Sequence, residues 1–124
     1  MPRTELRFYR EDGEVPLLEW LEGLSTKARA KCAVRLERLE DLGHELRRPE
    51  AEYLRDGIYE LRTKEAGVNY RMLYFFHGRL VVVVSHGFSK QRADVPSGEI
   101  DAALRRKGRF EENPERHTFK RRIR

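Results

Sequence analysis

Cysteine is almost absent from this sequence: Cys32 is the single example among 124 residues. A lone cysteine cannot form an internal disulfide, and it cannot supply a cluster of thiolates for zinc. Long apolar runs are absent too, because a stretch such as Leu80–Val84 is far shorter than the roughly 20 residues of a membrane-spanning helix. Residues 1–5 lead into no apolar signal segment. We therefore expect a chain that contacts no membrane, is not secreted and works in the reducing cytoplasm.

Motifs that bind cofactors or carry covalent chemistry are absent as well. The sequence has no glycine-rich phosphate loop and no nucleophile elbow. His44 and His117 stand at no metal-ligand spacing with an acidic residue. We therefore predict no metal and no cofactor. Repeats and low-complexity tracts are also absent, and 124 residues are enough for one domain with one core.

Charge is abundant and unevenly distributed along the chain. Lysine and arginine number 26 against 21 acidic residues, which gives a net charge of +5. Residues 1–61 carry a net charge of −3, whereas residues 62–92 carry +5 and residues 105–124 carry +6. A basic surface attracts polyanions, of which nucleic acid is the commonest. The distribution is compatible with a nucleic-acid partner for the second half, although many small domains are equally basic without one.

The periods of apolar and turn residues predict the element order strand, helix, helix, three strands, helix. The expected segments are a strand over 6–9, a helix over 16–24, a helix between Ser25 and Gly43, strands within 53–63, 69–77 and 80–88, and a helix from Pro96 to Phe110. We expect Pro114 to end regular structure, so that residues 1–114 form a single domain and residues 115–124 a basic C-terminal tail. The simplest assembly is an α+β domain, in which a helical hairpin packs on one face of a small, twisted, mainly antiparallel sheet.

Three short segments resemble a known family. The string Leu54–Arg62 resembles a segment of the RelE- and HigB-type toxins of bacterial toxin–antitoxin pairs. Asn69–Phe76 is similar to the family's aromatic strand with a central arginine, and His86–Gln91 is similar to its segment that ends in lysines. The three segments occur in the family's order, and the resemblance extends over residues 5–110. The subgroup that they most resemble is the HigB-like, phage-related one.

The resemblance implies a RelE-like fold, in agreement with the α+β arrangement expected from the residues. It also implies cleavage of mRNA in the ribosomal A site. The implied partners are mRNA, the ribosome and a cognate antitoxin, often a helix-turn-helix protein. ParE-like relatives instead inhibit DNA gyrase and cleave nothing, and a non-toxic member would act only as a binding partner in a repressor complex. The fold alone does not decide among these functions.

Four residues are candidates for catalysis: Arg71, Arg62, Lys90 and His86. RNA cleavage without a metal uses the substrate's own 2′-OH, so the protein must hold the phosphate and assist proton transfer. We expect Arg71 to contact phosphate, and the alternative is a structural pair with a carboxylate such as Glu60. Arg62 and Lys90 match basic residues of the family, and the alternative for both is an ordinary solvated side chain.

His86 is the natural acid or base, because only histidine titrates near neutral pH without perturbation. Its parity with Leu80, Val82, Val84 and Phe88 favours a buried, hydrogen-bonded core histidine instead. Further residues are expected to contact RNA: Lys64, Gln91, Arg92, Lys120, Arg121 and Arg122. Gln91 stands where the family has a second lysine. Glu60 stands where the best-known RelE-type enzymes have a lysine, which makes the expected site less positive. For the basic tail, a disordered solubilising role is the alternative.

Overall fold

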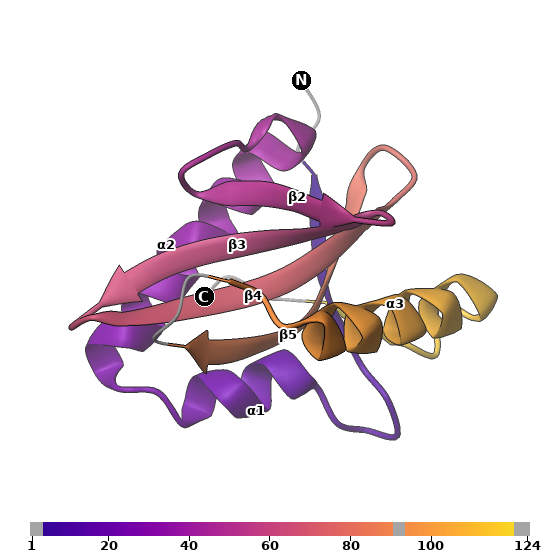
Figure 1. Cartoon of the computed structure of the whole chain (residues 1–124). Helices are drawn as coiled ribbons and strands as arrows, with labels where there is room; N and C mark the ends of the chain where they lie inside the picture. The colour runs from indigo at the N-terminus through magenta and orange to yellow at the C-terminus, as the bar shows by residue number, and fades with distance from the viewer. Residues whose placement is uncertain (1–3, 91–93, 121–124) are drawn as a thin grey trace.

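The computed structural model describes residues 4–90 and 94–120, with the backbone alone at Lys90. Its elements follow one another as β1 (Glu5–Tyr9), α1 (Pro16–Glu22), α2 (Thr26–Leu42), the 3-10 turn η1 (Gly43–Glu45), β2 (Ala51–Arg55), β3 (Ile58–Glu65), β4 (Val68–His77), β5 (Val81–Lys90), α3 (Ser97–Glu112) and β6 (Thr118–Lys120), as Figure 1 shows. α1 begins with Pro16 in its first turn, and the Ser25 hydroxyl caps α2 by accepting from the backbone N–H of Ala28.

The sheet has six strands in the order β2-β3-β4-β5-β1-β6. The strands β2 to β5 form an antiparallel meander, whereas β1 pairs parallel with β5 and antiparallel with β6. The helical hairpin and the meander together supply the long crossover that a parallel pair requires. The expected α+β class and the mainly antiparallel sheet are therefore confirmed.

Helices cover the two faces of the sheet separately (Figure 1). On one face α1 and α2 pack with β3, β4 and β5, and Leu36 and Met72 share this core. On the other face α3 packs with the same strands, and Leu73 and Phe110 share a second core. Residues 72–75 of β4 are buried on both faces, which explains why this strand is a continuous apolar run.

The sequence predicts one strand within residues 53–63, and this prediction was wrong in the number of strands. The structure has two strands there, β2 and β3. Asp56 and Gly57 separate β2 from β3 with φ angles of 52° and 86°. Two consecutive residues in the left-handed region form the tight turn typical of Asp-Gly hairpins. Asp56-Gly57 therefore forms a hairpin loop and does not lie inside a strand. As a result, β2 is an edge strand of the sheet.

Regular structure also continues beyond Pro114, contrary to the expectation of a tail from residue 115. β6 pairs with β1, and the buried His117 stacks on Tyr9 with 5.2 Å between the ring centroids. His117 Nδ1 also lies 2.8 Å from the carbonyl oxygen of Arg10. Residues 115–120 are thus part of the fold. Neither Pro114 nor the basic composition that follows it indicates this pairing, because the free edge of β1 exists only in the assembled sheet.

Within residues 4–90 and 94–120, no helix combines the length and the apolar character that crossing a membrane requires.

Candidate functional site

The predicted catalytic positions meet on three adjacent strands. The register gives three alternate cross-strand rows over β3, β4 and β5, whose side chains share one face of the sheet, namely Lys64–Asn69–Lys90, Arg62–Arg71–Phe88 and Glu60–Leu73–His86. Alternation places Arg62, Arg71 and His86 on the face that α3 partly covers. Segments that are far apart in the sequence therefore lie side by side on one face of the sheet. We call these three rows the strip; one end of it extends beyond the part of the sheet that α3 covers.

Arg71 is buried at the centre of this strip. It is 3% exposed, and its Nη1 donates a hydrogen bond to Oε1 of Glu60 at 2.6 Å, while Glu60 itself is 2% exposed. The Nε of Arg71 has no hydrogen-bond partner within the described part of the chain. Two opposite charges removed from water hold each other firmly, because neither has a solvated alternative. In this arrangement the guanidinium faces the carboxylate, and a phosphate would have to displace Glu60 to reach it.

Arg62 extends the same network toward solvent. Its Nη1 lies 3.4 Å from Glu60, its Nη2 lies 2.9 Å from Oε1 of Glu52, and its Nε donates to the carbonyl oxygen of Pro49 at 3.1 Å. Charges of alternating sign thus run from Arg71 through Glu60 and Arg62 to Glu52. The two carboxylates offset the positive charge of both arginines, which leaves the centre of the strip close to neutral.

Lys64 lies at the open end of the strip and is exposed. Arg62, Lys64 and Asn69 line a cavity of about 210 Å³ together with Arg35, Pro49 and Thr63. None of the ion pairs between described residues involves Lys64, although its backbone carbonyl accepts from the Lys31 ammonium at 3.0 Å. Lys64 is therefore available to an anionic ligand without the breaking of an internal pair.

Arg35 is a residue of this cavity that sequence reasoning missed. It lies on α2, and its Nε donates to the carbonyl oxygen of Arg62 at 2.9 Å while its Nη1 contacts Glu50 at 3.3 Å. Helical spacing places Arg35 beside the core stripe of α2, three residues after Cys32 and four before Leu39. Its approach to the strip depends on how α2 packs on β3, which no local pattern records.

His86 faces α3, so the expected parity with Val82 and Val84 was wrong, whereas the expected parity with Phe88 is confirmed. The pairing of β4 with β5 shifts by one residue between Leu73 and Tyr74, which leaves Ser85 as an extra residue in β5. Such a bulge reverses the alternation beyond it. His86 therefore shares the α3 side with Phe88, at 6.1 Å between ring centroids, and not the side of α1 and α2.

Both ring nitrogens of His86 have partners. Nδ1 lies 2.8 Å from the Ser85 hydroxyl, and Nε2 lies 2.9 Å from Oε1 of Glu99 at the start of α3. A carboxylate accepts hydrogen bonds, so we assign the proton to Nε2 and let Nδ1 accept from Ser85. Burial lowers the pKa of His86, and the hydrogen bond to Glu99 opposes that effect. His86 is 8% exposed, so the expectation of a buried, hydrogen-bonded histidine describes its geometry.

The remaining predicted RNA contacts lie elsewhere or outside the described residues. Lys120 stands in β6, at the edge of the sheet opposite to β2, and its Nζ is 3.8 Å from Glu5. The structure therefore does not bring Lys120 to the strip. Outside the described residues lie Gln91, Arg92, Arg121 and Arg122, and Lys90 is placed only by its backbone register opposite Asn69. Among the described residues, no three His, Cys, Asp or Glu side chains converge to hold a metal ion.

Fold and strip together define a small α+β domain, with a helical hairpin on one sheet face and a band of ionic residues on the other. Within that class the chain belongs to the family described as phage derived protein Gp49-like (DUF891), whose model matches residues 19–108. The match spans every described residue of the strip. No curated protein matches the chain.

Proposed function

We propose that this protein is the toxin of a type II toxin–antitoxin pair and that it cleaves mRNA on the ribosome, as HigB-like toxins do. The observation that carries the proposal is the cavity at the open end of the strip, with Lys64 and Arg62 beside Asn69. In the register, Lys90 stands opposite Asn69 in the same row. Membership of the phage-derived Gp49-like family and the resemblance of three segments to RelE- and HigB-type toxins support the same function.

The described residues contribute phosphate binding to this reaction. The 2′-OH of the substrate attacks the adjacent phosphorus, and negative charge builds up on the phosphoryl oxygens. Lys64 and Arg62 are the side chains that can reach such a group from the cavity. Arg71 holds Glu60 behind them, so its role is to position Arg62 through that carboxylate. Lys90 remains the predicted catalytic residue of β5. The cognate antitoxin, expected to be a helix-turn-helix protein, would neutralise the toxin by binding it.

Binding without cleavage is the second candidate function, and one observation favours it. Arg71 and Arg62 already contact carboxylates, and both nitrogens of His86 are occupied. A surface that is internally paired in this way suits a ParE-like inhibitor of gyrase, or a non-toxic partner in an antitoxin repressor complex.

The test is cleavage of A-site mRNA on programmed ribosomes by the full chain. We expect Lys64→Ala and Arg62→Ala to lower the single-turnover rate by about a hundredfold, the effect of losing one contact to a developing oxyanion. Arg79→Ala removes an exposed arginine from the β4–β5 turn and should leave the rate unchanged. Wild-type protein that cleaves no mRNA on ribosomes contradicts the nuclease proposal.

Pulse labelling after induced expression separates the two candidate functions in cells. The nuclease predicts an immediate stop of protein synthesis with fragmented mRNA. A gyrase inhibitor predicts a stop of DNA synthesis while protein synthesis and mRNA persist. A non-toxic binding member predicts no arrest of either.

A further inference from the structure

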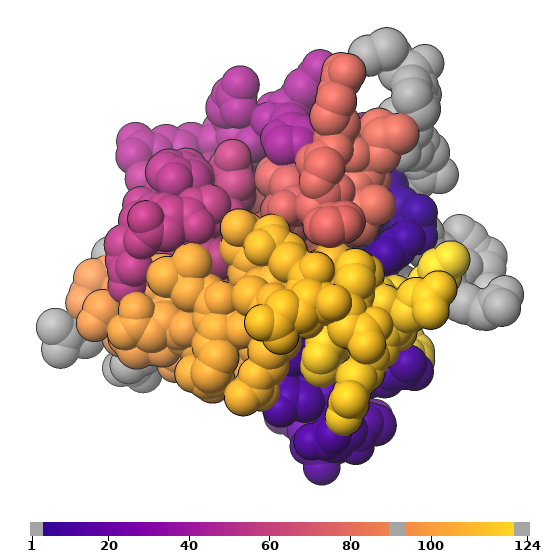
Figure 2. Space-filling view, turned by 90° about the vertical axis from the view of Figure 1, so that its right-hand side faces the viewer, coloured from indigo at the N-terminus to yellow at the C-terminus, as the bar shows by residue number. Residues whose placement is uncertain are grey.

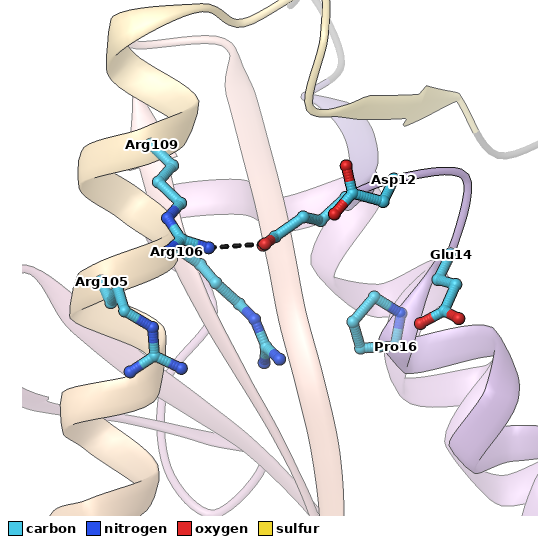
Figure 3. Close-up of a pocket in the computed structure, with 7 residues that line it drawn as sticks. Asp12, Glu14, Pro16, Arg105, Arg106 and Arg109 are labelled. Carbon is cyan, nitrogen blue, oxygen red and sulfur yellow. Dashed lines mark hydrogen bonds and ion pairs between the residues drawn. The ribbon is translucent and has the colours of Figure 1, made fainter.

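A second charged cavity lies between α3 and the segment that leads into α1. It has a volume of about 300 Å³ and is lined by Arg105, Arg106 and Arg109 of α3 and by Glu11, Asp12, Glu14 and Pro16 of the segment that leads into α1. In the space-filling view, α3 crosses the front of the molecule, and the indigo N-terminal segment lies beneath its yellow end (Figure 2). The close-up shows the arginines on one wall and Asp12, Glu14 and Pro16 on the other (Figure 3).

One of the three arginines is already neutralised. Arg109 Nη1 donates to Oε2 of Glu11 at 2.6 Å, and the Tyr9 hydroxyl donates to the other oxygen of the same carboxylate at 2.8 Å. These two donors occupy both oxygens of Glu11. The Glu11 carboxylate is thus hydrogen-bonded to Arg109 and Tyr9, and it attracts Arg106 only from a longer distance.

Arg106 is half-buried and has no carboxylate within 4.0 Å among the described residues. Its guanidinium lies 5.7 Å from the Tyr9 ring centroid, with only the Ser85 hydroxyl near it at 3.5 Å. In contrast, Arg71 and Arg62 of the strip both contact carboxylates. Burial lowers the pKa of Arg106, and the neighbouring charge of Arg105 lowers it further. Tyr9 and Glu11 offset part of this effect from a longer distance, but among the described residues no carboxylate pairs directly with Arg106.

Arg105 adds a second unpaired charge beside it. Arg105 is exposed, and no ion pair among the described residues includes it. Arg105 and Arg109 are four residues apart on α3, a spacing at which like charges repel. Figure 3 shows the Arg106 side chain reaching into the gap between α3 and the start of α1, with the Arg105 guanidinium close beside α3, and both residues line the cavity. An anion placed there would reduce this repulsion and could accept hydrogen bonds from two planar guanidinium groups.

We propose that Arg105 and Arg106 form a binding site for a single phosphate group. Two guanidinium groups suit a ligand with several acceptor oxygens and more than one charge. The opposite wall limits the ligand to one such group, because Asp12 and Glu14 would repel a polyanion that ran across the cavity. The phosphate can belong to a free ligand, such as inorganic phosphate or a nucleotide, or to an RNA strand. The site goes beyond the proposed function and stands whether or not the chain cleaves mRNA.

The test is titration of the full ¹⁵N-labelled chain with inorganic phosphate, with a nucleoside 5′-monophosphate and with a short RNA, while the arginine Nε–Hε signals are followed. We expect saturable shifts of the Arg105 and Arg106 signals, and affinity at least about tenfold weaker in Arg105→Gln and Arg106→Gln. Arg79→Gln removes the same charge from an exposed turn and is the matched control. Because Arg105 is exposed, its variant should keep the melting temperature of the wild type even if Arg106→Gln does not.

The three ligands identify the source of the phosphate. If the Arg105 and Arg106 signals respond to phosphate or to the nucleotide, the site binds a free ligand. If they respond to RNA alone, and Arg105→Gln loses this response, the site binds the phosphate of an RNA strand. If no ligand shifts these signals, or if both glutamine variants bind as the wild type does, the proposal is wrong.

Discussion

His86 and Glu99 join β5 to the first turn of α3, with 2.9 Å between Nε2 and Oε1. The contact bridges residues 13 positions apart on either side of the segment 91–93. It also fills the last free position on the imidazole, since Ser85 occupies Nδ1. An imidazole held on both sides positions a helix against a sheet, and it has no free nitrogen with which to exchange protons with a substrate.

Acid should weaken the fold through this histidine. Burial lowers the pKa of His86 below its ordinary value of 6.5, so the unfolded chain binds a proton there more readily than the folded one. The stability that the neutral imidazole provides is therefore complete above the ordinary pKa of the unfolded chain. This stability is lost as the pH falls through the lowered pKa of the folded chain. We expect the free energy of unfolding in urea to drop between about pH 7.5 and about pH 5.5, with a smaller drop in His86→Gln. His44→Gln, which replaces an exposed histidine, should retain the full drop, and an equal drop in all three proteins would contradict the assignment.

Loss of either partner of the buried pair in the strip should destabilise the protein strongly. Arg71→Ala leaves Glu60 buried without its main counter-charge, and Glu60→Ala does the same to Arg71. Each change should lower the free energy of unfolding by about 3–5 kcal/mol, whereas Arg71→Ala combined with Glu60→Ala should cost much less than the sum of the two. Urea unfolding of the four proteins provides the cycle. An Arg71→Ala protein as stable as the wild type would restore Arg71 as a direct phosphate contact.

Shortening the chain should reveal where the fold ends. A chain that stops at residue 114 loses β6 and the stacking of His117 on Tyr9, so we expect it to be less stable by about 2–4 kcal/mol. A chain that stops at residue 120 keeps both features and should melt as the full chain does. Thermal melts of the two shortened proteins make the comparison. Equal melting temperatures would mean that β6 contributes nothing to stability.

Gly87 and Trp20 offer a test of packing on the opposite face. A Cβ at position 87 would overlap the indole atoms of Trp20, so Gly87→Ala should destabilise the fold by about 1–3 kcal/mol. The chain has one tryptophan, and its fluorescence should therefore report the disturbance directly. Gly98→Ala is the matched control, because a Cβ there meets open space in the first turn of α3. If the two variants are equally stable, the contact between Gly87 and Trp20 is not as close as described.

The order of most elements could be predicted from the sequence because periodicity is a local signal. The apolar residues of α2 recur at helical spacing, and the aromatic run of β4 is continuous because both of its faces are covered. The position of His86 could not be predicted in this way, since one extra residue at Ser85 reverses the parity of everything after it. Arg71 and Glu60 lie on neighbouring strands, so the sequence allows a pair between them as the alternative to a phosphate contact. Whether that pair is closed to solvent depends on α3, which is distant in the sequence.

The place of β1 in the sheet has a consequence for how the protein is made. The first strand to be synthesised has as its neighbours the last strand of the meander and the strand at the end of the described chain. Such non-local pairings form late, because the intervening chain must first be closed into a loop. The sheet therefore cannot be completed until residues 118–120 have been synthesised.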